Sequence, residues 1–308
     1  AVERLTRYFC EEGIDFILLK GIALYLTVYG NRPGRYMSDI DILVKESQLK
    51  KVRAGLSSLG YEIDIADNPG KWRLNILSAA LKELTYEKKS EFGKVTLDMH
   101  WGITKGVKPA SVRQDRLWDN RVFHSIGDIS FPILSPENML IHHCLHLSKN
   151  MVLKKGLLVW FCDIIDTLRF YEDIIGWDYI LDFAANENIE DELYIILARI
   201  HTAGFVKLPD KVKYKIEPFC GKKILSAGIL DYPDQDAEGR YYLGLITNIP
   251  GLPNKARFTL SIVFPCREEL NRLYPQMRGK RPFLLYLHHW QRAIVKLFRV
   301  FKIIYVKE

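Results

Sequence analysis

Two aspartates stand inside an apolar segment, and their spacing indicates a cation site. Asp39 and Asp41 lie in the run SDIDILV (38–44), where the other residues after Ser38 are Ile, Leu or Val. Residues two apart in a strand point to the same face, so the two carboxylates would lie side by side. Two ionised carboxylates this close repel each other unless a cation is bound between them. Mg²⁺ (or Mn²⁺) suits such a site, because Mg²⁺ prefers carboxylate and phosphate oxygens.

A third carboxylate follows on a separate apolar segment. Asp98 lies in VTLDMHW, which alternates in the manner of a strand. Three carboxylates could then converge at one edge of a sheet, as in sites that hold metal ions for phosphoryl transfer. The alternative is that Asp39 and Asp41 are strand-end or turn residues bonded to backbone amides, which is the favoured interpretation of an isolated D-x-D.

Cationic residues near the acidic pair favour the metal interpretation. Lys20 and Gly21 follow a short apolar strand predicted at 14–19 and open a predicted helix, so the lysine and backbone N–H groups would face one region. Arg32 and Arg35 lie in the loop before the acidic strand, where a guanidinium can bind a triphosphate bidentately. The combination predicts a site for a metal ion and a triphosphate.

The same residues resemble a known superfamily. LLKG followed by a helix, and then SDIDILV, is similar to the nucleotidyltransferases that include DNA polymerase β and the aminoglycoside nucleotidyltransferases. The pattern more closely resembles a group labelled uncharacterised nucleotidyltransferases. That resemblance extends over most of the chain, through VTLDMHW, LSPENMLIHHCLHLSK, VWFCDIIDTL, RFTLSIVFP and LLYLHHWQR.

The resemblance implies a role for each matching residue. Asp39 and Asp41 correspond to the metal-binding pair, and Asp98 to the third carboxylate, which in such enzymes can act as a base towards the acceptor hydroxyl. Gly21 corresponds to the glycine that faces the triphosphate. The superfamily usually has Gly-Ser or Gly-Gly there, whereas this chain has Ile22 after the glycine. A serine contact to phosphate is lost, and Lys20 is expected to substitute for it.

A histidine-rich helix is a further candidate for the nucleotide site. His142 and His146 are four residues apart, with Lys149 one turn later, and we expect all three to face the substrate. The alternative is that the histidines pack at a helix interface. The H-E-x-x-H signature is absent, so a zinc site is not expected. Asp163, inside an apolar helix, would pair with one of these bases or act as a buried structural partner.

Two residues next to the aspartates complete the set of candidates. His100 shares the strand face of Asp98 and would orient it or contact phosphate, although a structural role is equally open. Ser38 directly precedes the acidic pair and is a candidate for contact with the nucleotide.

The elements that position these residues indicate an α+β (α/β-like) fold. Residues 1–130 alternate helical and strand patterns, which predicts a nucleotidyltransferase catalytic domain with a mixed sheet flanked by helices. Ser135 can cap a helix that has Pro136 in its first turn. From there helical patterns dominate, so we predict a mainly helical domain over 131–308 that closes the cleft. Its helices are expected at 135–149, 156–173, 177–187 and 190–204, and again from about 256.

Composition limits the class of protein. The 308 residues are 48% hydrophobic and 26% charged, as is ordinary for a soluble globular protein. No apolar run reaches the ~18–20 residues of a transmembrane helix, and the charged first residues of the sequence do not read as a signal peptide. Five scattered cysteines argue against a disulfide framework and against a thiolate zinc site. A cytoplasmic location is therefore expected.

The C-terminal segment has a basic stripe. Arg292, Lys296, Arg299 and Lys302 share one side of a predicted helix, opposite an apolar side. Such a helix can lie on a membrane or bind nucleic acid. Packing on its own domain with a solvated charged face is the favoured alternative.

The predicted activity is transfer of a nucleoside monophosphate from an NTP, with Mg²⁺, to an acceptor hydroxyl. The net charge of +7 is mild and evenly spread, which favours a small-molecule acceptor over nucleic acid. One alternative is a toxin-type nucleotidyltransferase acting on tRNA or protein. Another is a non-catalytic nucleotide-binding module, which the missing serine leaves open.

Overall fold

The chain forms two compact units in the computed structural model. The first comprises Ala1–Asp64, Lys82–Val107 and Ser111–Pro233, and the second Ile65–Leu81, Lys108–Ala110 and Asp234–Glu308. The predicted domain boundary near residue 130 remains a prediction. The structure describes residues 1–30, 35–63, 78, 80–91, 93–105, 108–152, 158–220, 244–265, 267–277 and 279–292.

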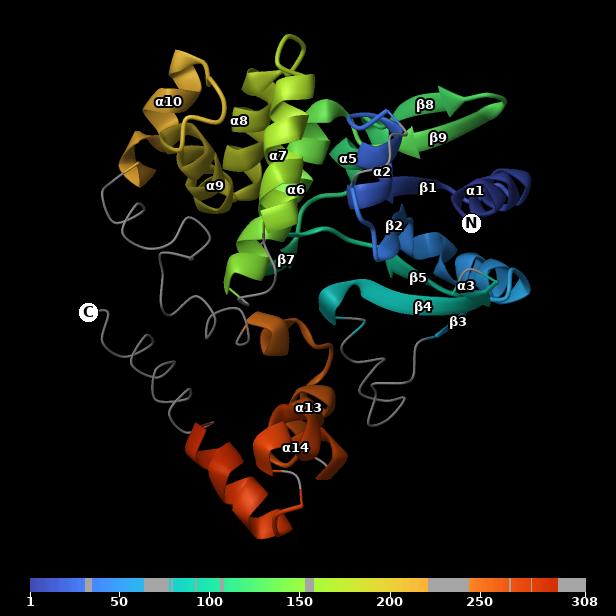
Figure 1. The fold of residues 1–308 in the computed structure, drawn as a ribbon, viewed down its shortest axis with the longest axis vertical. Helices are drawn as coiled ribbons and strands as arrows, with labels where there is room; N and C mark the ends of the chain where they lie inside the picture. Colours follow the sequence, from blue (N-terminus) through green and yellow to red (C-terminus); the bar gives the residue numbers. More distant parts are fainter. Residues whose placement is uncertain are drawn as a thin grey trace. The chain divides into compact units, whose positions relative to one another are not determined.

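A seven-stranded mixed sheet is the framework of the first unit (Figure 1). The strand order is β3-β4-β5-β2-β1-β9-β8, so the acidic strand β2 lies in the middle. It pairs in parallel with β5 and antiparallel with β1, while β1 runs parallel to β9. The strands are β1 (Phe16–Leu19), β2 (Asp39–Val44), β3 (Glu62–Ile63), β4 (Glu83–Ser90), β5 (Gly93–His100), β8 (Val122–Ile126) and β9 (Ile129–Ile133), with the short β6 (Thr104–Lys105) and β7 (Lys108–Ser111) between β5 and β8.

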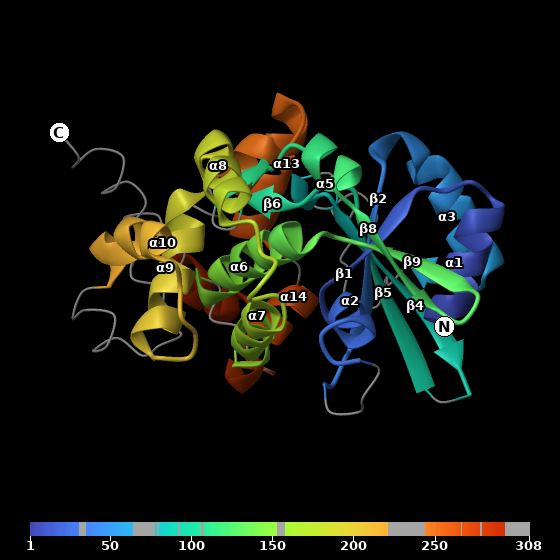
Figure 2. The same cartoon turned by 90° about the horizontal axis from the view of Figure 1, so that it is seen from above.

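Helices cover both faces of this sheet. Helices α1 (Val2–Glu11) and α3 (Leu49–Ser58) lie together on one side, whereas α6 (Pro136–Val152) and α7 (Leu158–Phe170) lie on the other (Figure 2). Helix α2 (Lys20–Leu26) directly follows β1 and contacts β1 and β2. The remaining elements of this unit are η1 (Glu46–Gln48), α5 (Asp115–Asp119), α8 (Trp177–Glu187), α9 (Glu190–Thr202), α10 (Asp210–Ile216) and η2 (Glu217–Phe219).

Apolar residues on the two faces of the sheet explain this layering. Leu5 and Phe9 of α1, with Leu56 of α3, are fully buried, as are Leu97 and Met99 of β5. Helix α6 is buried along most of its length and packs against α7, α8 and α9. As expected, Ser135 caps the start of this helix, because its hydroxyl accepts the Asn138 N–H at 3.4 Å.

The second unit is largely helical within the residues that the structure describes. It contains α13 (Leu252–Val263), α14 (Arg267–Leu273) and η3 (Pro275–Met277), and residues 282–292 are also helical. Two small cores hold it together, one formed by Ala80, Leu245, Ile249 and Phe258, the other by Leu270, Tyr274 and Leu285.

The predicted architecture is confirmed: a mixed sheet with flanking helices is followed by a largely helical C-terminal region. The helix predicted at 21–30 is shorter than expected, and the β8–β9 hairpin was not foreseen. The basic stripe lies outside the described residues from Lys296 onwards. No helix of the described part is long and apolar enough to cross a membrane.

Candidate active site

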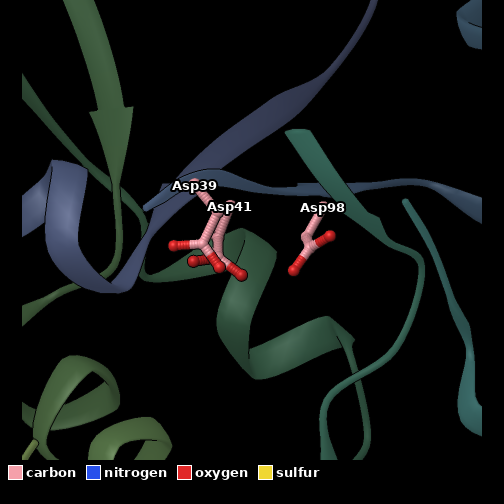
Figure 3. Close-up of side chains that lie close together, drawn as sticks. All are labelled: Asp39, Asp41 and Asp98. Atoms are coloured by element: carbon pink, nitrogen blue, oxygen red, sulfur yellow. The ribbon is translucent and has the colours of Figure 1, made fainter. Parts of the chain in front are cut away.

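The three aspartates lie together where β2 and β5 run in parallel. Asp41 and Asp98 are direct partners across the two strands, and Asp39 is two residues before Asp41. One carboxylate oxygen from each lies within 4.8 Å of those from the other two. Figure 3 shows the three side chains pointing to the same side of the two strands.

Strand alternation gives this face its polar character. In β5, Asp98 and His100 alternate with the buried Leu97 and Met99, which point to the opposite face. The same alternation in β2 separates the aspartates from Ile40 and Ile42. Because β2 is central, the acidic pair is flanked by strands on both sides and Asp41 is only 3% exposed.

The charge of Asp41 is compensated by two bases. The Lys20 ammonium donates to its Oδ1 at 2.5 Å, and His100 Nε2 lies 3.0 Å from the same oxygen. Burial would raise the pKa of Asp41, but the attraction of Lys20 and the contact with His100 lower the pKa overall. The carboxylate is therefore ionised.

The pKa of Asp98 is shifted in the opposite direction to that of Asp41. Burial and the charge of Asp41 raise its pKa, while a hydrogen bond donated by the Thr85 hydroxyl at 2.7 Å lowers it only in part. The two carboxylates thus repel each other across the strand pair. A divalent cation between them would relieve that repulsion, and oxygen ligands from carboxylates are those that Mg²⁺ and Mn²⁺ prefer. The residues therefore fit a divalent cation.

Glu83 of β4 belongs to the same network and was not predicted. Its Oε2 lies 3.6 Å from His100 Nδ1 and 4.0 Å from Lys149 Nζ. Burial would raise the pKa of Glu83, but the charges of Lys149, His100 and Lys20 lower the pKa overall. The alternation in ELTYE places Glu83 and Thr85 on the face of Asp98 once β4 pairs with β5, which was the signal available in the sequence.

Of the predicted α6 histidines, His142 is buried and His146 is half-buried next to this network. Burial lowers the pKa of both His142 and His146 to well below the usual range, and the Lys20 charge contributes to each shift. His146 packs edge-on against Trp160 with ring centroids 4.6 Å apart. Both rings are neutral in this setting, so they can exchange hydrogen bonds but supply no charge to a phosphate.

Arg35 has a protein partner in this structure. Its guanidinium forms a bidentate pair with Asp163 of α7, with Nη2–Oδ2 at 2.6 Å and Nε–Oδ1 at 3.1 Å. The Tyr29 hydroxyl lies 2.9 Å from the same carboxylate. Of the two roles foreseen for Asp163, the structure supports the buried structural partner. The expected contact of Arg35 with triphosphate remains a prediction that competes with this pair.

Gly21 and Ser38 each lie against another residue of the candidate site. A Cβ on Gly21 would approach Arg35 Nη1 to 3.0 Å, so the glycine allows the guanidinium to lie against α2. The Ser38 hydroxyl donates to Asp39 at 3.0 Å. Arg32 falls outside the described residues.

A pocket of about 480 Å³ opens beside Asp39. Its lining is mainly apolar, with Ser38, Asp39 and Lys94 among its polar residues. The apolar part is formed by Ile22, Tyr25, Leu26, Met37, Val95 and Phe131, among others.

The comparison with known families agrees with this geometry. A family model described as "Uncharacterised nucleotidyltransferase" matches residues 1–203, which include the sheet, the three aspartates and α6. The chain belongs to this family. As a nucleotidyltransferase it is assigned to an enzyme class, with the acidic triad as its candidate catalytic centre. No curated protein and no solved structure matches the chain of this nucleotidyltransferase.

Proposed function

We propose that this nucleotidyltransferase uses Mg²⁺ (or Mn²⁺) to transfer a nucleoside monophosphate from an NTP to a hydroxyl group of a small acceptor molecule. The observation that carries the proposal is the convergence of three carboxylate oxygens within 4.8 Å on one face of a central strand pair. The family match makes an NTP the expected donor.

Asp39, Asp41 and Asp98 would hold the cation. Bound there, a divalent cation supplies charge neutralisation on the phosphates and polarises the acceptor hydroxyl. Asp41 is ionised because of Lys20 and His100, so it provides a permanent negative charge. Ser38 fixes the carboxylate of Asp39 by donating to it.

Asp98 is suited to take the proton of the acceptor. Its pKa is raised by burial and by Asp41, and the Thr85 hydroxyl orients its carboxylate. The acceptor oxygen would form a bond to the α-phosphorus while the bond to the β-phosphate oxygen breaks. The hydroxyl proton passes to Asp98, and pyrophosphate leaves with the bonding electron pair.

Phosphate and base contacts would come from α2 and α6. Lys20 supplies the positive charge nearest the triad, and Lys149 supplies another beside Glu83. His142 and His146 are neutral, so their role would be hydrogen bonding to the nucleotide. Arg32 precedes the acidic strand in the sequence, where its guanidinium would also be available to a phosphate.

The pocket beside Asp39 supports a small-molecule acceptor. Its volume of about 480 Å³ falls within the range of sites for small ligands. Asp39 both lines the pocket and belongs to the triad, so a hydroxyl on a molecule bound there would lie near the reacting phosphate. The lining favours an acceptor with an apolar body. We place the reaction in the cytoplasm, because scattered cysteines suit a reducing compartment.

A labelling experiment tests this function. The protein is incubated with Mg²⁺, each of the four α-³²P-labelled NTPs in turn, and cell extract separated into small-molecule, RNA and protein fractions. We expect label in the small-molecule fraction, lost in Asp39→Asn and Asp41→Asn. Asp15→Asn is the matched control, because Asp15 is a half-exposed aspartate that pairs with Lys45, and it should label like the wild type.

Each other outcome has a defined meaning. Label in RNA or protein would keep the transferase chemistry and overturn the small acceptor in favour of a toxin-type enzyme. No label from any NTP in any fraction, with NTP binding intact by calorimetry, would overturn the reaction in favour of a non-catalytic nucleotide-binding module.

A further inference from the structure

Lys20 occupies an unusual place for a phosphate-binding lysine. It follows β1 directly, and because Leu19 lies opposite Asp41 in the β1–β2 ladder, the next residue comes within reach of that aspartate. Its backbone φ is +48°, a left-handed conformation that is strained for a residue with a side chain. The ammonium then lies 2.5 Å from Asp41 Oδ1.

This ion pair lies inside the carboxylate triad. The Lys20 side chain is 14% exposed and that of Asp41 is 3% exposed, so little water screens the charges around them. A divalent cation held by the triad would lie a few ångströms from the ammonium, and the two positive charges would repel each other. Lys20 and the divalent cation therefore compete for the same carboxylate.

We propose that Lys20 exchanges partners during substrate binding: it neutralises Asp41 before the divalent cation enters and turns to the NTP phosphates once the cation is bound. This inference rests on the proposed function. The lysine stem is flexible enough for such a change, and a triphosphate brings the negative charge that the ammonium needs after it leaves Asp41.

The exchange makes cation and nucleotide depend on each other. A cation that enters alone must displace Lys20 without offering it a new partner. A nucleotide that enters alone must draw Lys20 away from Asp41, which then keeps its contact with His100 but loses the charge of the lysine. Each ligand therefore improves the affinity for the other, and the improvement is equal in both directions.

A lysine with a purely structural role predicts a different result. If Lys20 only stabilised Asp41 in the cation-bound state, removing its charge would weaken cation binding or leave it unchanged. Partner exchange predicts that removing the charge strengthens binding of the cation alone.

Partner exchange and a purely structural role can be separated by measuring Mn²⁺ binding at pH 8 without nucleotide, by electron paramagnetic resonance. We expect Lys20→Met to bind Mn²⁺ at least about tenfold more tightly than the wild type, because repulsion between a single and a double charge at about 5 Å reaches that factor even at the dielectric constant of bulk water. Lys20→Arg keeps the charge and should bind Mn²⁺ no more tightly than the wild type. Lys45→Met, which removes the half-exposed partner of Asp15, is the matched control and should leave Mn²⁺ affinity unchanged.

A second measurement tests the coupling. Saturating α,β-methylene-ATP should increase Mn²⁺ affinity strongly in the wild type and much less in Lys20→Met. If Lys20→Met is less stable than the wild type without the cation, the rise in melting temperature on adding Mn²⁺ is compared instead. Tighter binding of Mn²⁺ by the variant should make its rise larger than that of the wild type.

The outcomes distinguish this inference from the proposed function. If Lys20→Met binds Mn²⁺ as weakly as the wild type or more weakly, while Asp39→Asn abolishes binding, the partner exchange is wrong and the metal site stands. If neither the wild type nor Lys20→Met binds Mn²⁺ more tightly than Asp39→Asn does, the metal site itself is wrong, and the inference falls with it.

Discussion

Replacing Arg35 by Met tests whether this arginine is structural or binds phosphate. The Arg35 and Asp163 side chains are 11% and 4% exposed and form two hydrogen bonds, so the substitution leaves a buried carboxylate without its cation. Breaking a buried pair in this way costs about 3–5 kcal/mol. We therefore expect a large fall in the urea midpoint of unfolding. Arg116→Met is the matched control, because the Arg116–Asp182 pair is on the surface, and its loss should leave the urea midpoint close to that of the wild type.

A double-mutant cycle with Asp163→Leu isolates the pair. The double variant should lose clearly less stability than the sum of the two single variants, since neither partner is left buried alone. The reasoning would be refuted if Arg35→Met unfolded at the wild-type urea concentration and instead bound NTP more weakly. In that case the ion pair contributes little, and the phosphate contact expected from the sequence is the true role.

Three further predictions concern stability. Asp98→Asn should raise the urea midpoint of the cation-free protein at pH 8, because a raised pKa means that ionisation of Asp98 disfavours the folded state. The difference in urea midpoint between the variant and the wild type should therefore grow as the pH rises from about 4. An equal or lower midpoint for the variant at pH 8 would contradict this. The pKa of Asp41 is lowered in the folded state, so its ionised form stabilises the fold above the unfolded pKa of about 4, and this stabilisation is lost progressively below it. Urea unfolding at pH 3–7 should therefore show the free energy of unfolding falling more steeply with acid in the wild type than in Asp41→Asn. Equal slopes would contradict this. Gly21→Val should lower the free energy of unfolding by about 1–3 kcal/mol in the same assay, because a Cβ at this position would already approach Arg35 Nη1 to 3.0 Å and Met37 Cγ to 3.1 Å. An unchanged free energy of unfolding would show that these two side chains move aside.

The fold and the acidic triad were predictable because they depend on local patterns. Asp39 and Asp41 show the two-residue period within a strongly apolar strand, and Asp98 shows it in another. Ser135 and Pro136 mark the start of α6 by local capping chemistry. Each of these signals lies within a few residues of the feature that it predicts.

The partners of the charged groups were not predictable, because they depend on register and on long-range packing. Glu83 reaches His100 only through the β4–β5 register, which leaves no mark beyond polar alternation. Asp163 follows Arg35 by 128 residues, and an arginine in a loop before an acidic strand suits a phosphate as well as a carboxylate. Lys20 was recognised as a cation near the site, but its attachment to Asp41 depends on the β1–β2 pairing.

The central claim is that Asp39, Asp41 and Asp98 hold the divalent cation that nucleotidyl transfer requires. Anomalous diffraction from crystals grown with Mn²⁺ and α,β-methylene-ATP tests it most directly. The account predicts a Mn²⁺ peak within about 2.5 Å of carboxylate oxygens of the triad, with the triphosphate on the same ion. A nucleotide bound with its Mn²⁺ elsewhere, or bound with no peak at the triad, would contradict the account.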